Sequence, residues 1–231
     1  MTAQTEDSRN NLDATDDVPM FGVPAPDVFS RPQDTIDVVV PVLDHLAVVV
    51  SGIGPEHLAK ATPCRDYDVA ALRDHVLGWL QFFAAALNDP QRRTERLDPM
   101  AYRATEDERD LGDVVRQARD DLANAVRAGV QEGDVVVSQA RMTGPAVLGM
   151  LQGEYVVHGW DLARATGQRW RPGDAAVTAA HEMFAGMVSP QYRGTGPDAF
   201  FGEEVAVADD APALDRLLGF AGRDPNWTPL A

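Results

Sequence analysis

A carboxylate and an imidazole stand four residues apart at Glu154 and His158, inside the run GEYVVHGWDLARATGQ. On a helix this spacing puts both side chains on one face, with about 6 Å of axial rise between them. Such a pair can hold a divalent metal, and it can equally be an ordinary surface pair. The metal interpretation therefore depends on a third ligand from another part of the chain.

The best candidate for that third ligand is His75, in the apolar segment LRDHVLGWLQFFAAAL. Two histidines and one glutamate leave an open coordination position on zinc. That arrangement belongs to catalytic sites rather than to closed structural ones. The three residues therefore predict a centre that could carry out chemistry.

Each of these residues interrupts an apolar helical stripe. A buried carboxylate is costly without a partner, so Glu154 needs either a metal or an arginine. Spacing alone favours satisfied core residues over a metal, because the E-x-x-x-H pattern is common by chance and is not the HExxH motif. The other stripe members are aliphatic or aromatic: Val147, Leu151, Leu162 and Ala165 in one segment, and Leu72, Trp79, Phe82, Phe83 and Ala86 in the other.

Two further residues are candidates for contacts around a metal or cofactor. Trp79 follows His75 by one helical turn and would line a pocket there; core packing is the alternative. Asp161 could accept a hydrogen bond from a ligand histidine, or it could pair with Arg164 or another surface cation. The remaining candidates have plainer interpretations, with His45 structural, His57 and His181 solvated, and Cys64 a small packed residue.

The composition argues against several classes of function. The 231 residues carry a formal net charge of −16, which argues against binding to nucleic acid or to an anionic membrane. No apolar run approaches the roughly 20 residues of a membrane span, and the N-terminus lacks the pattern of a secretory signal. We therefore expect a cytoplasmic protein. Cys64 is the only cysteine, so neither an intrachain disulfide nor a thiolate cluster can form.

Helical periodicity dominates the chain after residue 33. It predicts helices over about 35–50, 69–88, 111–130, 145–165 and 174–188, and a short one near 212–221. Asp68 is the predicted N-cap of the second helix, and Gly167 the predicted end of the fourth. The run 135–138 is β-branched but short and isolated, so no strand pair is predicted. The fold class is therefore all-α, a four-helix bundle with short additional C-terminal helices.

Residues 1–33 are polar and then proline-rich, which predicts an N-terminal arm ahead of a bundle formed by residues 34–231. The prolines at 19, 24, 26 and 32 forbid a regular helix there. The composition favours a disordered tail. The alternative is an extended arm anchored on this chain or on a neighbour by its apolar side chains: Val18, Met20, Phe21, Val23 and Phe29.

Three stretches, TPCRDYDVAALRDHVLGW, GEYVVHGWDLARATGQ and FGEEVAVADDAPALDRLLGFAGRDPNW, resemble the DinB-like (YfiT-like) metalloenzyme superfamily. They are most similar to the actinobacterial branch that includes the N-terminal domain of mycothiol-dependent maleylpyruvate isomerase. The resemblance implies a four-helix bundle with a divalent metal, usually zinc, bound by a histidine on helix two and a Glu/His pair on helix four. The matching positions are His75, Glu154 and His158. The arm departs from the family pattern, and homodimer formation or substrate recognition are the roles left open for it.

The hypothesis that follows is a metal-dependent thiol transferase or isomerase acting on a small electrophilic metabolite. Mycothiol is the expected thiol, because relatives implied by the resemblance use it. Arg141, just before the fourth helix, is the arginine expected to position carboxylate or sugar groups. The alternatives are a metal-dependent hydrolase of the same fold and a non-catalytic protein that binds a small molecule or confers resistance to it.

Overall fold

The computed structural model describes residues 20, 22–105, 110–194 and 199–229. None of the helices in these ranges combines the length and apolar character that crossing a membrane requires. The six α-helices are α1 (Pro32–Ser51), α2 (Val69–Asn88), α3 (Leu111–Arg127), α4 (Gly144–Thr166), α5 (Asp174–Met187) and α6 (Ala213–Phe220). Single 3-10 turns cover Asp27–Ser30, Pro55–His57, Val130–Glu132 and Pro190–Tyr192.

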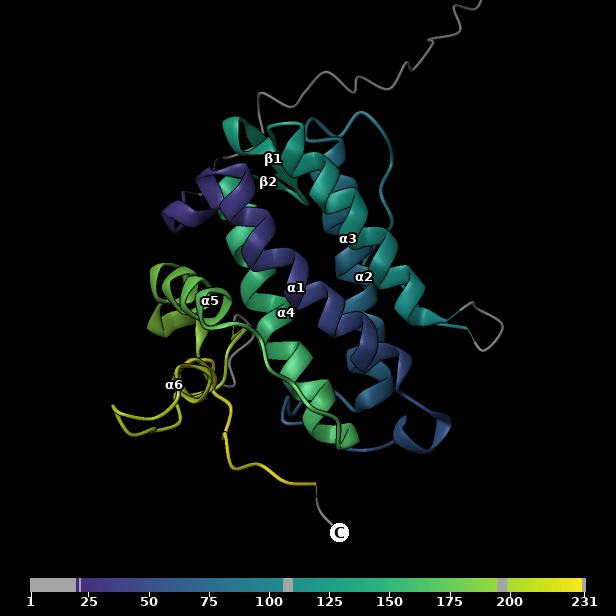
Figure 1. Cartoon of the computed structure of the whole chain (residues 1–231), viewed down its shortest axis with the longest axis vertical. Helices are drawn as coiled ribbons and strands as arrows, with labels where there is room; N and C mark the ends of the chain where they lie inside the picture. The colour runs from purple at the N-terminus through teal and green to yellow at the C-terminus, as the bar shows by residue number, and fades with distance from the viewer. Residues whose placement is uncertain (1–19, 21, 106–109, 195–198, 230–231) are drawn as a thin grey trace, which may run out of the picture.

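The first four helices form the predicted bundle (Figure 1). Helices α1 and α2 each contact both α3 and α4, so the four close around a shared apolar core. Helix α5 packs on α4, and α6 packs on α5. The all-α class and the DinB-like arrangement are therefore confirmed. The core is filled by fully buried leucines from all four helices, among them Leu43, Leu46, Leu72, Leu80, Leu122, Leu151 and Leu162.

Local capping fixes the starts of the two helices that carry the site residues. The Asp68 carboxylate accepts a hydrogen bond from the Ala71 N–H at 2.8 Å, which satisfies a free donor at the start of α2. At the start of α4, the Thr143 hydroxyl accepts one from the Ala146 N–H at 3.3 Å. Helix α4 ends at Gly167, whose φ of 73° is the left-handed conformation that glycine adopts readily. The predicted N-cap at Asp68 and stop at Gly167 are thus confirmed.

A β-hairpin closes one end of the bundle, so the prediction that no strands pair was wrong. Strand β1 (Asp134–Val137) pairs antiparallel with β2 (Ala140–Thr143), with Ser138 at a φ of 52° in the turn. The valines of β1 are buried against the bundle. Packing on the helices stabilises this short pair. The sequence of β2, ARMT, alternates apolar and polar residues, so a short strand signal followed the β-branched run 135–138 and was missed.

The described part of the N-terminal segment packs on this chain. Phe29 is fully buried in the core, Val23 packs against it, and Met20 forms an isolated bridge with Arg141. The candidate anchors Val18 and Phe21 lie outside the described residues. Helix α1 already begins at Pro32, so the expectation that Pro32 excludes a helix was wrong, because proline suits the first turn, where its missing N–H costs nothing.

Gly153 permits the close approach of α4 and α5, and an alanine there should destabilise the fold. An added Cβ would lie 2.2 Å from Cε1 of Phe184, whose ring is itself held against Phe201. We expect Gly153→Ala to cost an amount in the upper part of the range of about 1–3 kcal/mol known for overpacking. This exceeds the gain of about 1 kcal/mol in helix propensity. Urea denaturation measures the difference.

Gly133→Ala is the matched control, because a Cβ at Gly133 meets nothing within 4 Å and its backbone is extended. It should leave the free energy of unfolding essentially unchanged. A Gly153→Ala protein as stable as the wild type would contradict the proposed contact.

Candidate metal centre

The structure brings His75, Glu154 and His158 together, with one donor atom from each lying within 4.8 Å of the others. The Nε2 atom of His75, on α2, lies 2.8 Å from Oε1 of Glu154 on α4. The Nε2 atom of His158, one turn further along α4, lies 3.4 Å from the same oxygen. The side chain of Glu154 is 27% exposed and that of His158 only 10%, so the cluster is most accessible at the carboxylate.

Each imidazole is held on its outer side by a second partner. The Nδ1 atom of His158 lies 2.9 Å from Oδ2 of Asp161, and Nδ1 of His75 lies 3.4 Å from the Tyr67 hydroxyl. These contacts leave Nε2 of both rings to face the centre. Two imidazole nitrogens and one carboxylate oxygen, with the rings oriented from behind, form a donor set that fits a divalent metal with an open position.

The carboxylate of Glu154 stays ionised in this arrangement. Burial by itself would raise its pKa, but the attraction of His158 and the hydrogen bond with His75 outweigh burial and hold the pKa at about 2. An ionised carboxylate is what a metal ligand requires. Burial raises the pKa of the Tyr67 hydroxyl, and the nearby Cys64 and Glu154 raise it further. The hydroxyl therefore remains neutral beside His75.

Asp161 joins the cluster to the C-terminal segment of the chain. Its side chain is fully buried and accepts hydrogen bonds from Nη2 and Nε of Arg223, at 3.2 and 3.4 Å. Asp161 therefore contacts a site histidine and also pairs with a cation, but that cation is not Arg164, which donates to the Trp227 carbonyl at 2.7 Å. Sequence reasoning missed Arg223, because a lone arginine far along the chain carries no spacing signal.

The connector between α1 and α2 contributes Cys64 and Tyr67. The Cys64 sulfur lies within 4.8 Å of donor atoms of His158 and Asp161. Burial raises the pKa of Cys64 to about 11, although Arg223 acts in the opposite direction. A protonated, partly buried thiol is a poor nucleophile, in keeping with the interpretation of Cys64 as a packed residue. Tyr67 was not identified as a site residue from the sequence. The signal available for it was its position just before Asp68, the N-cap of the helix that carries His75.

Two other predicted site residues have different placements. Trp79 lies beside the cluster, with its ring centroid 6.4 Å from that of His75. Arg141 is not brought to the cluster. It lies in β2 opposite Val136, ahead of α4. Glu154 comes ten residues after the first residue of α4, about 15 Å along the helix axis.

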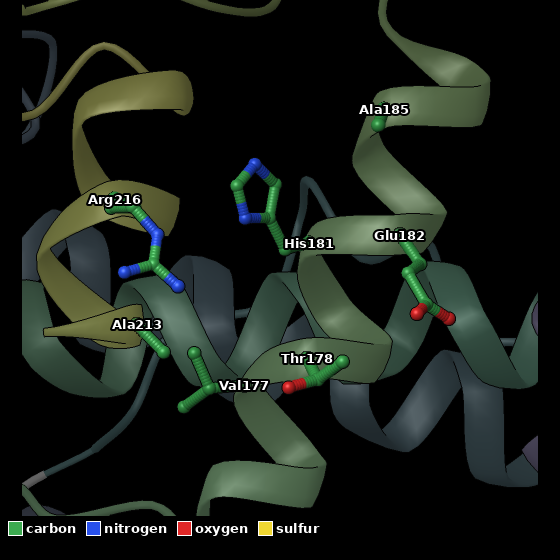
Figure 2. A pocket seen from close by; sticks show the side chains of 7 residues that line it. All are labelled: Val177, Thr178, His181, Glu182, Ala185, Ala213 and Arg216. Atoms are coloured by element: carbon green, nitrogen blue, oxygen red, sulfur yellow. The ribbon is translucent and has the colours of Figure 1, made fainter. Parts of the chain in front are cut away.

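The remaining histidines lie elsewhere. His45 stacks on Trp170 with ring centroids 4.7 Å apart, and His57 accepts a hydrogen bond from the Gly54 N–H. His181 is not simply solvated: it contacts the Phe220 ring and lines a pocket of about 300 Å³ between α5 and α6 (Figure 2). All lining residues of that pocket belong to α5 and α6, so it is separate from the cluster on α2 and α4.

The uncharacterized proteins MT0763 and Rv0738, from two strains of Mycobacterium tuberculosis, are each 25% identical to this chain over 185 residues, covering 78% of this chain and 92% of the relative. No solved structure gives a significant match. A family model described as the mycothiol maleylpyruvate isomerase N-terminal domain matches residues 40–163. This range is more than half of the chain and contains His75, Glu154, His158 and Asp161. The chain therefore belongs to the family of the mycothiol maleylpyruvate isomerase N-terminal domain.

Proposed function

We propose that this protein is a metal-dependent enzyme that acts on a small electrophilic metabolite with the help of a low-molecular-weight thiol. It either transfers the thiol to the metabolite or uses the thiol to isomerise the metabolite, and mycothiol is the expected thiol. The observation that carries the proposal is the convergence of Nε2 of His75 and Nε2 of His158 on one oxygen of Glu154. The description of the family, which names mycothiol and an isomerase, supports the choice of thiol and reaction class.

The metal would be held by His75, Glu154 and His158, and three protein ligands leave one position for a small molecule. A bound zinc or other divalent cation supplies positive charge that favours the thiolate form of a thiol. The sulfur would form a bond to an electrophilic carbon. It would either displace a group, which leaves with its bonding electron pair, or add to an activated double bond, whose π electrons move to the activating group. In an isomerisation the carbon–sulfur bond would then break, the double bond would re-form and the thiolate would be released.

Other side chains of the site orient these groups and shield them from water. Asp161 and Tyr67 hold the two imidazole rings from behind, so little reorganisation accompanies ligand binding. Trp79 lies beside His75 and packs on Phe82 and Phe83. The indole of Trp79 beside His75 would limit the access of water to that side of the centre, which suits thiolate chemistry better than chemistry that consumes water.

The first prediction of the proposal concerns His75. We expect His75→Ala to lose stoichiometric zinc while keeping its helical content, because its ring faces the cluster at the edge of the core and the side chain is 16% exposed. Elemental analysis and circular dichroism measure the two properties. The control is His181→Ala, which removes a histidine of the separate pocket and should bind zinc as the wild type does. Full zinc content in His75→Ala would remove this residue from the site.

A second prediction concerns the thiol. Titration calorimetry of the zinc-loaded protein with mycothiol should show binding, and the His75→Ala protein should show none. The absence of binding to the zinc-loaded wild type would rule out the thiol part of the proposal and leave the metal part standing.

Turnover assays with and without thiol then separate the alternatives. Conversion of an electrophilic substrate only in the presence of thiol is the expected result. Conversion without thiol would instead indicate a hydrolase, in which water takes the open position and loses a proton more readily. Tight binding of a small molecule without product would indicate a binding or resistance protein.

A further inference from the structure

Arg223 has no role in the function proposed above, although it pairs with Asp161, which contacts the candidate ligand His158. Asp161 is fully buried and Arg223 is 8% exposed, which makes this an interior pair. Arg223 follows the turn at Gly222, whose φ is 77°, and its Nη1 donates to the Ala221 carbonyl at 2.8 Å. The guanidinium is thus fixed at the end of α6 with its other nitrogens directed at α4.

We propose that Arg223 is a positioning residue of the metal centre, acting through Asp161 on His158, and that it couples docking of the C-terminal segment to metal binding. The C-terminal segment is defined here as residues 213–229. This inference rests on the proposed metal-dependent function.

The hydrogen bonds of the Asp161 carboxylate all converge on one atom. Oδ2 accepts from Nδ1 of His158 and from two nitrogens of Arg223, whereas Oδ1 has no hydrogen-bond partner among the described residues. A guanidinium that donates two bonds fixes a carboxylate more firmly than a single donor does. The rotation of Asp161, and with it the direction in which the His158 ring points, therefore depends on Arg223.

The buried carboxylate also needs this cation for its charge. An unpaired carboxylate in a protein interior is strongly unfavourable, and a neutral imidazole does not neutralise it. Arg164, the nearest cation in sequence, is occupied with the Trp227 carbonyl. Arg223 supplies the charge from a different part of the chain, so the orientation of His158 is complete only when the C-terminal segment is docked.

Two polar side-chain contacts join the C-terminal segment to α4, and only one of them involves a residue that touches the cluster. The Arg223–Asp161 pair lies inside, and the bond from Arg164 to the Trp227 carbonyl lies at the exposed surface. Figure 1 shows α6 next to α5, with the chain that follows α6 running toward the C-terminal end of α4. Because coupling between two events is reciprocal, metal binding should in turn stabilise the docked segment.

The test compares Arg223→Met, Arg223→Lys and Arg164→Ala in the full chain. Metal affinity is measured by competition with a chelator, using Zn²⁺ for affinity and Co²⁺ for its absorption spectrum, which reports the coordination geometry. Arg223→Met should weaken the affinity by about 10- to 100-fold, as is typical when an outer partner of a ligand is lost. It should also alter the Co²⁺ spectrum. Arg223→Lys should recover part of the loss, and Arg164→Ala should bind as the wild type does.

The reciprocal half of the proposal is measured by hydrogen exchange over residues 213–229, with and without Zn²⁺. Zinc should slow exchange of this segment in the wild type and have little effect on it in Arg223→Met. If Arg223→Met does not fold, the double variant Asp161→Asn with Arg223→Met removes both charges and keeps an acceptor for His158. It should still show weakened affinity.

Each of the remaining outcomes contradicts a defined part of the proposal about Arg223. Wild-type affinity and spectrum in Arg223→Met, or in the folded double variant, overturn the coupling while the metal centre stands. An equal loss of affinity in Arg164→Ala assigns the effect to docking alone and overturns the role of the ion pair. A wild type that binds no Zn²⁺ overturns the proposed function and this inference together.

Discussion

The constraint on which the structure depends is that a carboxylate and two imidazoles must be placed inside an apolar bundle and must satisfy one another there. Glu154 interrupts the core-facing stripe of α4, and a lone carboxylate in that position would be strongly unfavourable. His75 supplies a partner only if α2 presents it at the same level along the bundle. The caps at Asp68 and Thr143 fix where the two helices begin, so local hydrogen bonds set the register of the site.

The elements outside the four-helix core can be understood from the same constraint. The connector before α2 brings Tyr67 behind one histidine, and the chain after α6 brings Arg223 behind the partner of the other. Neither group could come from the bundle helices without placing another charge or hydroxyl in the apolar core. Segments outside the bundle therefore supply Tyr67 and Arg223, whereas the three candidate ligands and Asp161 lie on rigid helices, an arrangement that favours a well-defined geometry.

The residues that sequence reasoning could find are those with a local or periodic signal. His75, Glu154 and His158 stood out because they break apolar stripes, and Asp161 because it lies one turn from His158. Arg223 depends on a contact between distant segments, for which a single sequence has no period to follow. The hairpin and Tyr67 lie close in sequence to the groups they contact, but their local signals are short and were missed. Arg141 shows the limit of nearness in sequence: it lies just before α4, but the helix carries Glu154 about two to three turns away from its own first residue.

The charges around the centre narrow the kind of ligand that would complete it. The family match ends at residue 163, so it includes both carboxylates, Glu154 and Asp161, but not the cation that pairs with Asp161. Since Arg223 neutralises Asp161, a divalent cation held by Glu154 and two neutral imidazoles would leave a net charge of about +1 in a poorly solvated place. An anionic ligand at the open position would balance that charge, and a neutral one would not. Without Arg223 the same centre would be close to neutral and would lose this preference, so on the proposed function the C-terminal segment would affect the choice of ligand as well as the orientation of His158.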